Sequence, residues 1–328
     1  MKRKKFISNA MLTAAGLSLG KIVHSSQPTR PLISEMGDVK GRNVAEKMKI
    51  CLFSKQLQWL NYDDMARAVA DMGYDGIDLT VRPGGHVLPQ DVERDLPKAV
   101  EAAEKSGVKI IMISTDISEA NGANTEKVLK TAAALKIHYY RTNGFAYQKE
   151  LDILANLDNI RTRFTGIAAI NKKYGLHSDY LNHSDEGFGA AIWDLWEAIK
   201  DLDPVCVGSQ FDIKHATIDG PYSWPVVFKL IHKYIGTMVI RDFTWEKSSG
   251  KWIIRPMPIG EGVVDFAKYF DLVKQYNVPG PISVMCDYEL GGAENGARTL
   301  TIAKEKILTA MKHDLEKLKT YLSAAGLQ

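Results

Sequence analysis

The residues best suited to chemistry stand at the end of an apolar run. Residues 205–220 read VCVGSQFDIKHATIDG, so an apolar segment leads into Asp212 and His215 and stops at a Gly-Pro pair. An apolar run bounded by turn residues is typical of a strand buried on both faces. A carboxylate and an imidazole at such a strand end could transfer a proton or bind a ligand. Alternatively, the aspartate caps the next turn and the histidine bonds to the backbone.

Polar side chains follow most of the other apolar runs as well. Arg82 and His86 stand in the segment VRPGGH, whose two glycines let the backbone turn sharply and approach an anionic or polyhydroxylated ligand. The other candidates are Thr115, Asp116, Arg141, Asn143, Asn182, His183, Ser184, Asp185, Arg241, Asp242, Asp287, Tyr288 and Glu289. Any one of them could be structural or solvated. Together they indicate a site, because the carboxyl ends of barrel strands converge on one mouth.

The elements that must position these residues alternate along the chain. The apolar runs are 50–53, 76–80, 109–114, 138–141, 176–181, 205–212, 237–242 and 282–287. Stretches with helical spacing lie at 62–72, 89–105, 125–135, 149–173, 190–200, 223–234, 264–276 and 298–322. Eight strand–helix units over about 275 residues predict an α/β fold, a (β/α)8 TIM barrel. A doubly wound sheet is disfavoured, because the first loop, SKQLQWLN, has no glycine for a phosphate turn.

An additional hairpin is expected after the seventh strand. Residues 244–257 read TWEKSSGKWIIRPM, in which Ser-Ser-Gly is typical of a hairpin turn. Trp245 and Trp252 could form an aromatic wall for a sugar ring, or could pack the hairpin onto the barrel or onto a partner subunit.

The amino-terminal segment predicts export. Residues 1–25 combine KRKK, a short apolar stretch and small polar residues, which is the pattern of a signal peptide of the Sec or twin-arginine type. A disordered basic tail is the alternative. Residues 26–47 resemble a linker, and residues 48–328 form the expected single barrel domain. The protein is therefore expected to be exported, to the periplasm, with no membrane span in the mature chain.

Charge and cysteine content exclude other classes of function. The 328 residues have a formal charge of +3, and five basic residues with no acid lie in the first 25, so the remainder is close to neutral. Such a chain has no electrostatic footprint for nucleic acid. Cys51, Cys206 and Cys286 lie in apolar runs without any C-x-x-C pair, and are interpreted as core residues.

Five segments resemble one known family. They are LNH at 181–183, FDIKH at 211–215, Arg241-Asp242, PIGEGVVDF at 258–266 and PISVMCDYELGG at 281–292. Their order and spacing resemble the xylose-isomerase-like TIM barrels, the group of sugar and sugar-phosphate isomerases and epimerases to which endonuclease IV is distantly related. The resemblance covers roughly residues 49–322.

The resemblance implies a divalent cation, held in the family by Glu, Asp, His and Glu on the fifth to eighth strands. Asp212 matches the second ligand, whereas Leu181, Val239 and Asp287 stand at the others. Leucine and valine cannot bind a metal. His183 shares a strand face with Leu181, so an altered Zn, Mn or Mg site could use Asp212, Asp287 and His183.

A second interpretation dispenses with the metal. Arg241 shares a face with Val239, and its fixed positive charge could replace the cation beside Asp212 and Asp287. The resemblance implies His215 as a substrate contact.

The function expected from these features is a carbohydrate isomerase or epimerase that transfers a proton next to a carbonyl. Its expected catalytic residues are Asp212, Asp287 and Arg241, and its expected substrate contacts are Arg82, His86, Arg141, His215 and Trp245. The alternatives are a non-catalytic carbohydrate-binding barrel and a lyase or hydrolase acting on an oxidised sugar. A small-molecule carbohydrate is the expected partner, an exported enzyme would favour a free sugar or uronate, and a homo-oligomer is left open.

Overall fold

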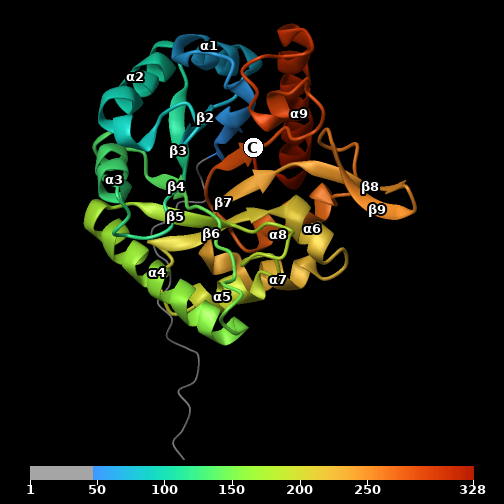
Figure 1. Ribbon diagram of the computed structural model, residues 1–328. Helices are drawn as coiled ribbons and strands as arrows, with labels where there is room; N and C mark the ends of the chain where they lie inside the picture. Colours follow the sequence, from blue (N-terminus) through green and yellow to red (C-terminus); the bar gives the residue numbers. More distant parts are fainter. Residues whose placement is uncertain (1–46) are drawn as a thin grey trace, which may run out of the picture. The chain divides into compact units, whose positions relative to one another are not determined.

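Eight parallel strands close into a barrel that is surrounded by helices (Figure 1). The computed structural model describes residues 47–328. The strands follow one another around the barrel in the order β1-β10-β7-β6-β5-β4-β3-β2. They are β1 Ile50–Phe53, β2 Gly76–Val81, β3 Lys109–Thr115, β4 Tyr139–Arg141, β5 His177–Leu181, β6 Val207–Asp212, β7 Ile235–Ile240 and β10 Ile282–Val284. The predicted (β/α)8 barrel is confirmed.

The helices begin and end at local signals in the sequence. Asn61 caps α1 because its side chain accepts a hydrogen bond from the Asp64 N–H, and Gly73 ends the helix at a φ of 88°. The α-helices are α1 Tyr62–Met72, α2 Val92–Lys105, α3 Thr125–Ala134, α4 Ile153–Tyr174, α5 Trp193–Ile199, α6 Ile213–Asp219, α7 Trp224–Ile231, α8 Phe266–Gln275 and α9 Lys304–Ala325. Short 3-10 turns lie at Ser54–Leu57, Pro89–Asp91, His232–Tyr234 and Ala293–Asn295.

Several boundaries differ from the sequence-based prediction, and those of β6, β7 and β10 concern the candidate site. The strand β7 spans residues 235–240 rather than 237–242, so Arg241 directly follows it. The strand β6 passes directly into α6, a helix that the sequence pattern did not predict. Asp212 caps this helix by accepting the His215 N–H. The strand β10 ends at Val284, so Asp287 lies on the following loop. The last helix begins at residue 304 rather than 298.

Polar side chains inside the barrel are matched with one another. Ser114 and Ser283 donate hydrogen bonds of 2.8 Å to the two oxygens of the buried Asp78. Nearer the amino-terminal ends of the strands, Asp179 contacts His177 Nε2 at 2.8 Å and accepts the Thr237 hydroxyl at 2.7 Å. Burial of a carboxylate is costly unless it is bonded, so these contacts hold the strands in register.

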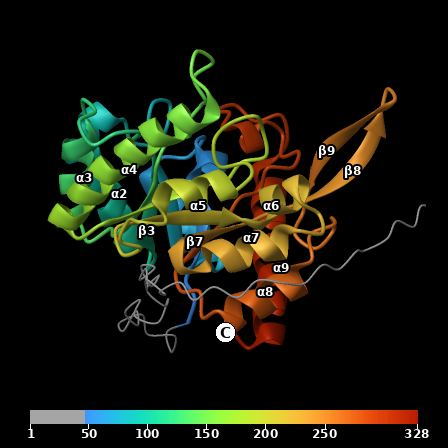
Figure 2. The same ribbon diagram turned by 90° about the horizontal axis from the view of Figure 1, so that it is seen from below.

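The predicted hairpin is present and consists of β8 Asp242–Ser248 and β9 Lys251–Met257. It projects away from the barrel and its helices (Figure 2). At its base, the Asp242 carboxylate accepts hydrogen bonds from the N–H groups of Phe243, Gly260, Gly262 and Val264. The PIGEG segment therefore supports the base of the hairpin.

Some expectations concern residues that the structure does not describe. The predicted signal peptide at 1–25 and the linker up to residue 46 lie outside the described range. Within residues 47–328, every helix is too short or too polar to cross a bilayer. Cys51, Cys206 and Cys286 are buried and free of disulfide bonds, as expected for core residues.

Candidate active site

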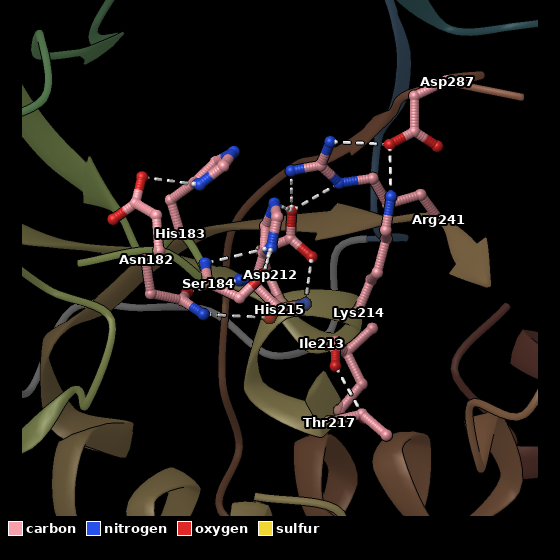
Figure 3. A network of polar contacts seen from close by, with 11 residues as sticks. Asn182, His183, Ser184, Asp212, Ile213, Lys214, His215, Thr217, Arg241 and Asp287 are labelled. Carbon is pink, nitrogen blue, oxygen red and sulfur yellow. Dashed lines mark hydrogen bonds and ion pairs between the residues drawn. The ribbon is translucent and has the colours of Figure 1, made fainter. Parts of the chain in front are cut away.

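A buried guanidinium lies between two carboxylates at the carboxyl ends of the strands (Figure 3). Arg241, just after β7, donates from Nε to Asp212 Oδ2 at 2.7 Å and from Nη1 to Asp287 Oδ2 at 3.0 Å. Asp212 is fully buried, whereas the side chain of Asp287 is 21% exposed. Burial alone would lower the pKa of Arg241, but the two carboxylates raise it above its ordinary value. Arg241 is therefore a permanent cation in this site.

Lys214 adds a second cation. It lies on α6, is buried, and donates from Nζ to the same Asp287 oxygen that Arg241 contacts. Burial lowers the pKa of Lys214, and Arg241 lowers it further, although Asp287 opposes this shift. Asp287 Oδ1 is buried and has no hydrogen-bond partner among residues 47–328. The cluster thus leaves one carboxylate oxygen without a hydrogen bond.

His215 presents a proton donor beside this cluster. Its Nδ1 accepts the Ser184 N–H at 3.1 Å and lies 2.6 Å from Ser184 Oγ. Nδ1 is therefore unprotonated, and the ring proton must be on Nε2, which is buried without a partner in the described chain. Burial lowers the pKa of His215 far below its ordinary value, and Arg241 adds to this effect. The imidazole is neutral and offers one N–H.

The predicted metal ligands do not form a metal site in this arrangement. The Asp212 carboxylate contacts Arg241 and the His215 N–H, and Asp287 contacts Arg241 and Lys214. His183 instead lies 3.0 Å from Asp185, and its side chain is 53% exposed. No group of three or more His, Cys, Asp or Glu in residues 47–328 is arranged to hold a metal ion.

The residues at the two altered ligand positions support the same conclusion. Leu181 and Val239 pack with Phe53 and Met285 in a small apolar cluster. Apolar carbon atoms therefore stand where metal ligands would be needed, next to a guanidinium that repels cations. The donor set does not fit the divalent cation that the resemblance implies.

A cavity of about 370 Å³ opens next to Arg241. Among the predicted site residues, Arg82, Arg141, His183 and Arg241 line this cavity. Asp212, Asp287 and His215 do not line it but belong to the ion cluster around Arg241 (Figure 3). The structure thus brings together most of the residues that the sequence analysis placed at the mouth.

Besides His215, which belongs to the ion cluster, two further predicted substrate contacts lie outside the cavity. His86 is packed between the Thr80 hydroxyl, 3.3 Å from its Nδ1, and the Leu57 carbonyl, 3.2 Å from its Nε2. Burial lowers the pKa of His86 to about 4, so it is a neutral structural group. Trp245 stands on the hairpin, where its ring packs against Phe243. Neither residue lines the cavity.

Three site residues were missed in the sequence. Lys214 lies inside the FDIKH segment, in which only Asp212 and His215 were predicted to have a role. Lys55 and Phe53 both line the cavity from the end of β1 and the loop after it. The position of this loop directly after a strand is the signal that could have identified them.

Comparisons with known proteins extend this description. A family model described as xylose isomerase-like TIM barrel matches residues 66–321. No curated protein matches the chain.

Several solved structures share the fold. The 3-keto-D-glucoside 4-epimerase from E. coli is 13% identical with a TM-score of 0.60 over 84% of this chain and 100% of that one. The D-psicose 3-epimerase from Clostridium cellulolyticum H10, solved with D-tagatose, is 11% identical with a TM-score of 0.60 over 84% and 99%. A xylose isomerase-like TIM barrel protein from Mycobacterium smegmatis, solved in complex with magnesium, is 17% identical with a TM-score of 0.57 over 82% and 98%.

Proposed function

Because the chain belongs to the xylose isomerase-like TIM barrel family, we propose that it is a carbohydrate isomerase or epimerase that transfers a proton next to a carbonyl. The observation that carries this proposal is the cluster of Arg241, Asp287 and Lys214 beside the cavity. It combines a permanent cation, a free carboxylate oxygen and an amine of lowered pKa. Such groups are what proton abstraction next to a carbonyl requires.

Arg241 is proposed as the electrophile. Its Nε and both terminal nitrogens contact carboxylates, but each terminal nitrogen carries a second N–H. These N–H groups can bind the carbonyl oxygen of a sugar and stabilise the negative charge that develops there when the neighbouring C–H bond breaks. Asp212 is assigned a positioning role. Its carboxylate accepts hydrogen bonds from Arg241 Nε and from the His215 N–H, so it orients the guanidinium and caps α6.

Asp287 and Lys214 are proposed as the proton-transfer pair. Asp287 Oδ1 accepts the proton from carbon, and the electron pair of the broken C–H bond forms the enediolate. Lys214, adjacent to Asp287, returns a proton to carbon. Return to the neighbouring carbon, with transfer of the hydroxyl proton to the former carbonyl oxygen, gives an isomer, and return to the opposite face of the same carbon gives an epimer. The proton on Asp287 then passes to Lys214, which restores both groups. The Nε2–H of His215 is available to orient a substrate hydroxyl.

The test is deuterium exchange. The purified protein is incubated in deuterated water with a panel of aldoses, ketoses and uronates, and incorporation at carbon is followed by NMR. Incorporation should occur with at least one sugar and should fall at least about 100-fold in Asp287→Asn and Lys214→Met, as expected for loss of a general base or acid. Asp271→Asn, an exposed carboxylate on α8, is the matched control and should leave the rate unchanged.

Two outcomes would redirect the proposal. Binding of a sugar without deuterium incorporation would favour a non-catalytic carbohydrate-binding barrel. Loss of water or of a substituent from an oxidised sugar would favour a lyase, because proton abstraction next to a carbonyl also begins an elimination. Export is proposed from residues 1–25, and recovery of the protein from the periplasmic rather than the cytoplasmic fraction would test it.

A further inference from the structure

The cavity beside Arg241 is lined by four basic side chains. They come from different parts of the barrel and are Lys55 after β1, Arg82 after β2, Arg141 at the end of β4 and Arg241 after β7. Asp185 also lines the cavity, where it pairs with His183 at 3.0 Å and accepts the Gly187 N–H. Positive charge therefore exceeds negative charge around this space.

Three of the four cations make no direct ion pair within residues 47–328, although the buried Asp78 acts on Arg82 and Arg141 from a distance. Arg241 is paired with Asp212 and Asp287, whereas Lys55, Arg82 and Arg141 form no ion pair with a carboxylate in residues 47–328. The guanidinium carbons of Arg82 and Arg141 lie 5.6 and 5.0 Å from the centre of the Phe53 ring. Stacking on a ring occupies the faces of the two guanidinium groups and leaves their N–H edges available.

Gathering these charges around one cavity is unfavourable. Burial lowers the pKa of Arg141 to about 10; the buried Asp78 opposes this shift, whereas Arg82 and Arg241 add to it. Burial also lowers the pKa of Lys55, with further contributions from Arg82 and Arg241. An anion placed among these groups would relieve their mutual repulsion, so the arrangement favours an anionic ligand.

We propose that this cavity binds the oxyanion of an acidic sugar through Lys55, Arg82 and Arg141, an assignment that rests on the proposed function. Guanidinium edges bind carboxylate and phosphate oxygens in pairs, and lysine adds a point charge. The remainder of the sugar then extends toward Arg241 and Asp287, where the proton transfer is placed. The substrate class is a uronate or other sugar acid, or a sugar phosphate with the same oxyanion chemistry.

Isothermal titration of the purified protein tests this assignment with four probes: D-glucuronate, D-glucose, D-glucose 6-phosphate and malonate. D-glucuronate should bind at least about ten-fold more tightly than D-glucose. Arg82→Gln and Lys55→Gln should each remove most of that preference. Arg94→Gln, an exposed arginine on α2, is the control and should retain it. Because Arg141 is buried, Arg141→Gln is used only if its thermal unfolding matches the wild type.

The probes separate the possible failures. Equal binding of D-glucose and D-glucuronate, or an undiminished preference in both Arg82→Gln and Lys55→Gln, would overturn the anion assignment while leaving a sugar function intact. Binding of malonate in an Arg82-dependent manner, without binding of any sugar, would support the anion site and refute the proposed function. No binding of any probe would overturn both. Tighter binding of the phosphate than of the uronate would identify a phosphorylated substrate.

Discussion

Replacement of Arg241 by methionine tests whether the guanidinium holds the ion cluster together. The change removes the cation between Asp212 and Asp287 while keeping a side chain of similar length. Asp212 is fully buried and would retain only the main-chain N–H of His215 and, at 3.9 Å, the His215 ring Nε2 as partners in the cluster. Removing one partner of a buried ion pair costs about 3–5 kcal/mol, because the other charge is left uncompensated.

The structure places the expected cost of Arg241→Met near the lower limit, at about 3 kcal/mol. Asp287 keeps Lys214 as a partner and is partly exposed, so most of the cost comes from Asp212. Such a loss is a large part of the about 5–15 kcal/mol by which a domain is stable, yet the variant should still fold. Urea unfolding followed by circular dichroism at pH 7 measures the change in the free energy of unfolding.

A double variant and a surface control sharpen this experiment. Arg241→Met with Asp212→Asn removes the buried charge and should recover about 1–3 kcal/mol relative to the sum of the single changes. Arg255→Met breaks an exposed pair with Glu246 and should have no measurable effect. If Arg241→Met costs less than about 1 kcal/mol, the value of a surface pair, or if the two changes are additive, the cluster does not behave as a buried ion network.

Three further predictions follow from other parts of the molecule. The ordinary pKa of histidine, 6.5, falls to about 4 in folded His86, so the unfolded chain binds more protons between these values and stability should decrease as pH falls from 6.5 to 4. His86→Gln should flatten that slope in pH-dependent urea titrations, and an unchanged slope would contradict it. Gly236→Ala should cost about 1–3 kcal/mol because its Cβ would lie 2.0 Å from His177 Nε2, whereas Gly166→Ala, with its nearest contact at 3.4 Å, should not destabilise. Thermal unfolding midpoints of the two variants distinguish these cases. Treatment with EDTA should leave both the thermal midpoint and the deuterium exchange of the purified protein unchanged, because carboxylates engaged by Arg241 and Lys214 are poor metal ligands; loss of exchange that Mn²⁺ or Zn²⁺ restores would contradict this.

The barrel could be predicted because its strands are buried on both faces. Runs such as 50–53 and 109–114 contain few polar residues, and their ends agree with the structure to within one residue. The predicted eighth strand, 282–287, is longer than the observed β10. Apolar Met285 and Cys286 continue the hydrophobic pattern after the hydrogen-bonded strand has ended at Val284. Hydrophobicity reports burial, and burial continues beyond the last strand hydrogen bond.

The missed helix α6 shows a different limit. Its seven residues are too short for a periodic pattern, and its capping residue, Asp212, also has the character of a ligand. Short helices depend on tertiary packing more than on intrinsic propensity. Asp212 serves both as the cap of α6 and as the partner of Arg241, and only the second contact depends on the distant strand β7.

The candidate site was predictable only where strand ends carried charge. Arg241 and Asp287 could be placed at one mouth from strand order alone. The structural role of His86 could not be predicted from the sequence, because its partners Leu57 and Thr80 come from neighbouring elements. Likewise, the packing of Leu181 with Val239 follows from register around the barrel, which a single sequence does not reveal.

The hairpin has a consequence for how the chain can change without losing its fold. The two ends of the insertion, Asp242 and Met257, are paired with each other, so the segment leaves and rejoins the barrel at one place. Asp242 also anchors the following loop through backbone N–H groups, independently of the residues at the hairpin tip. The tip, Ser249-Gly250, can therefore be lengthened, shortened or joined to another domain, which makes it a natural position for diversification and for attaching a reporter in protein engineering.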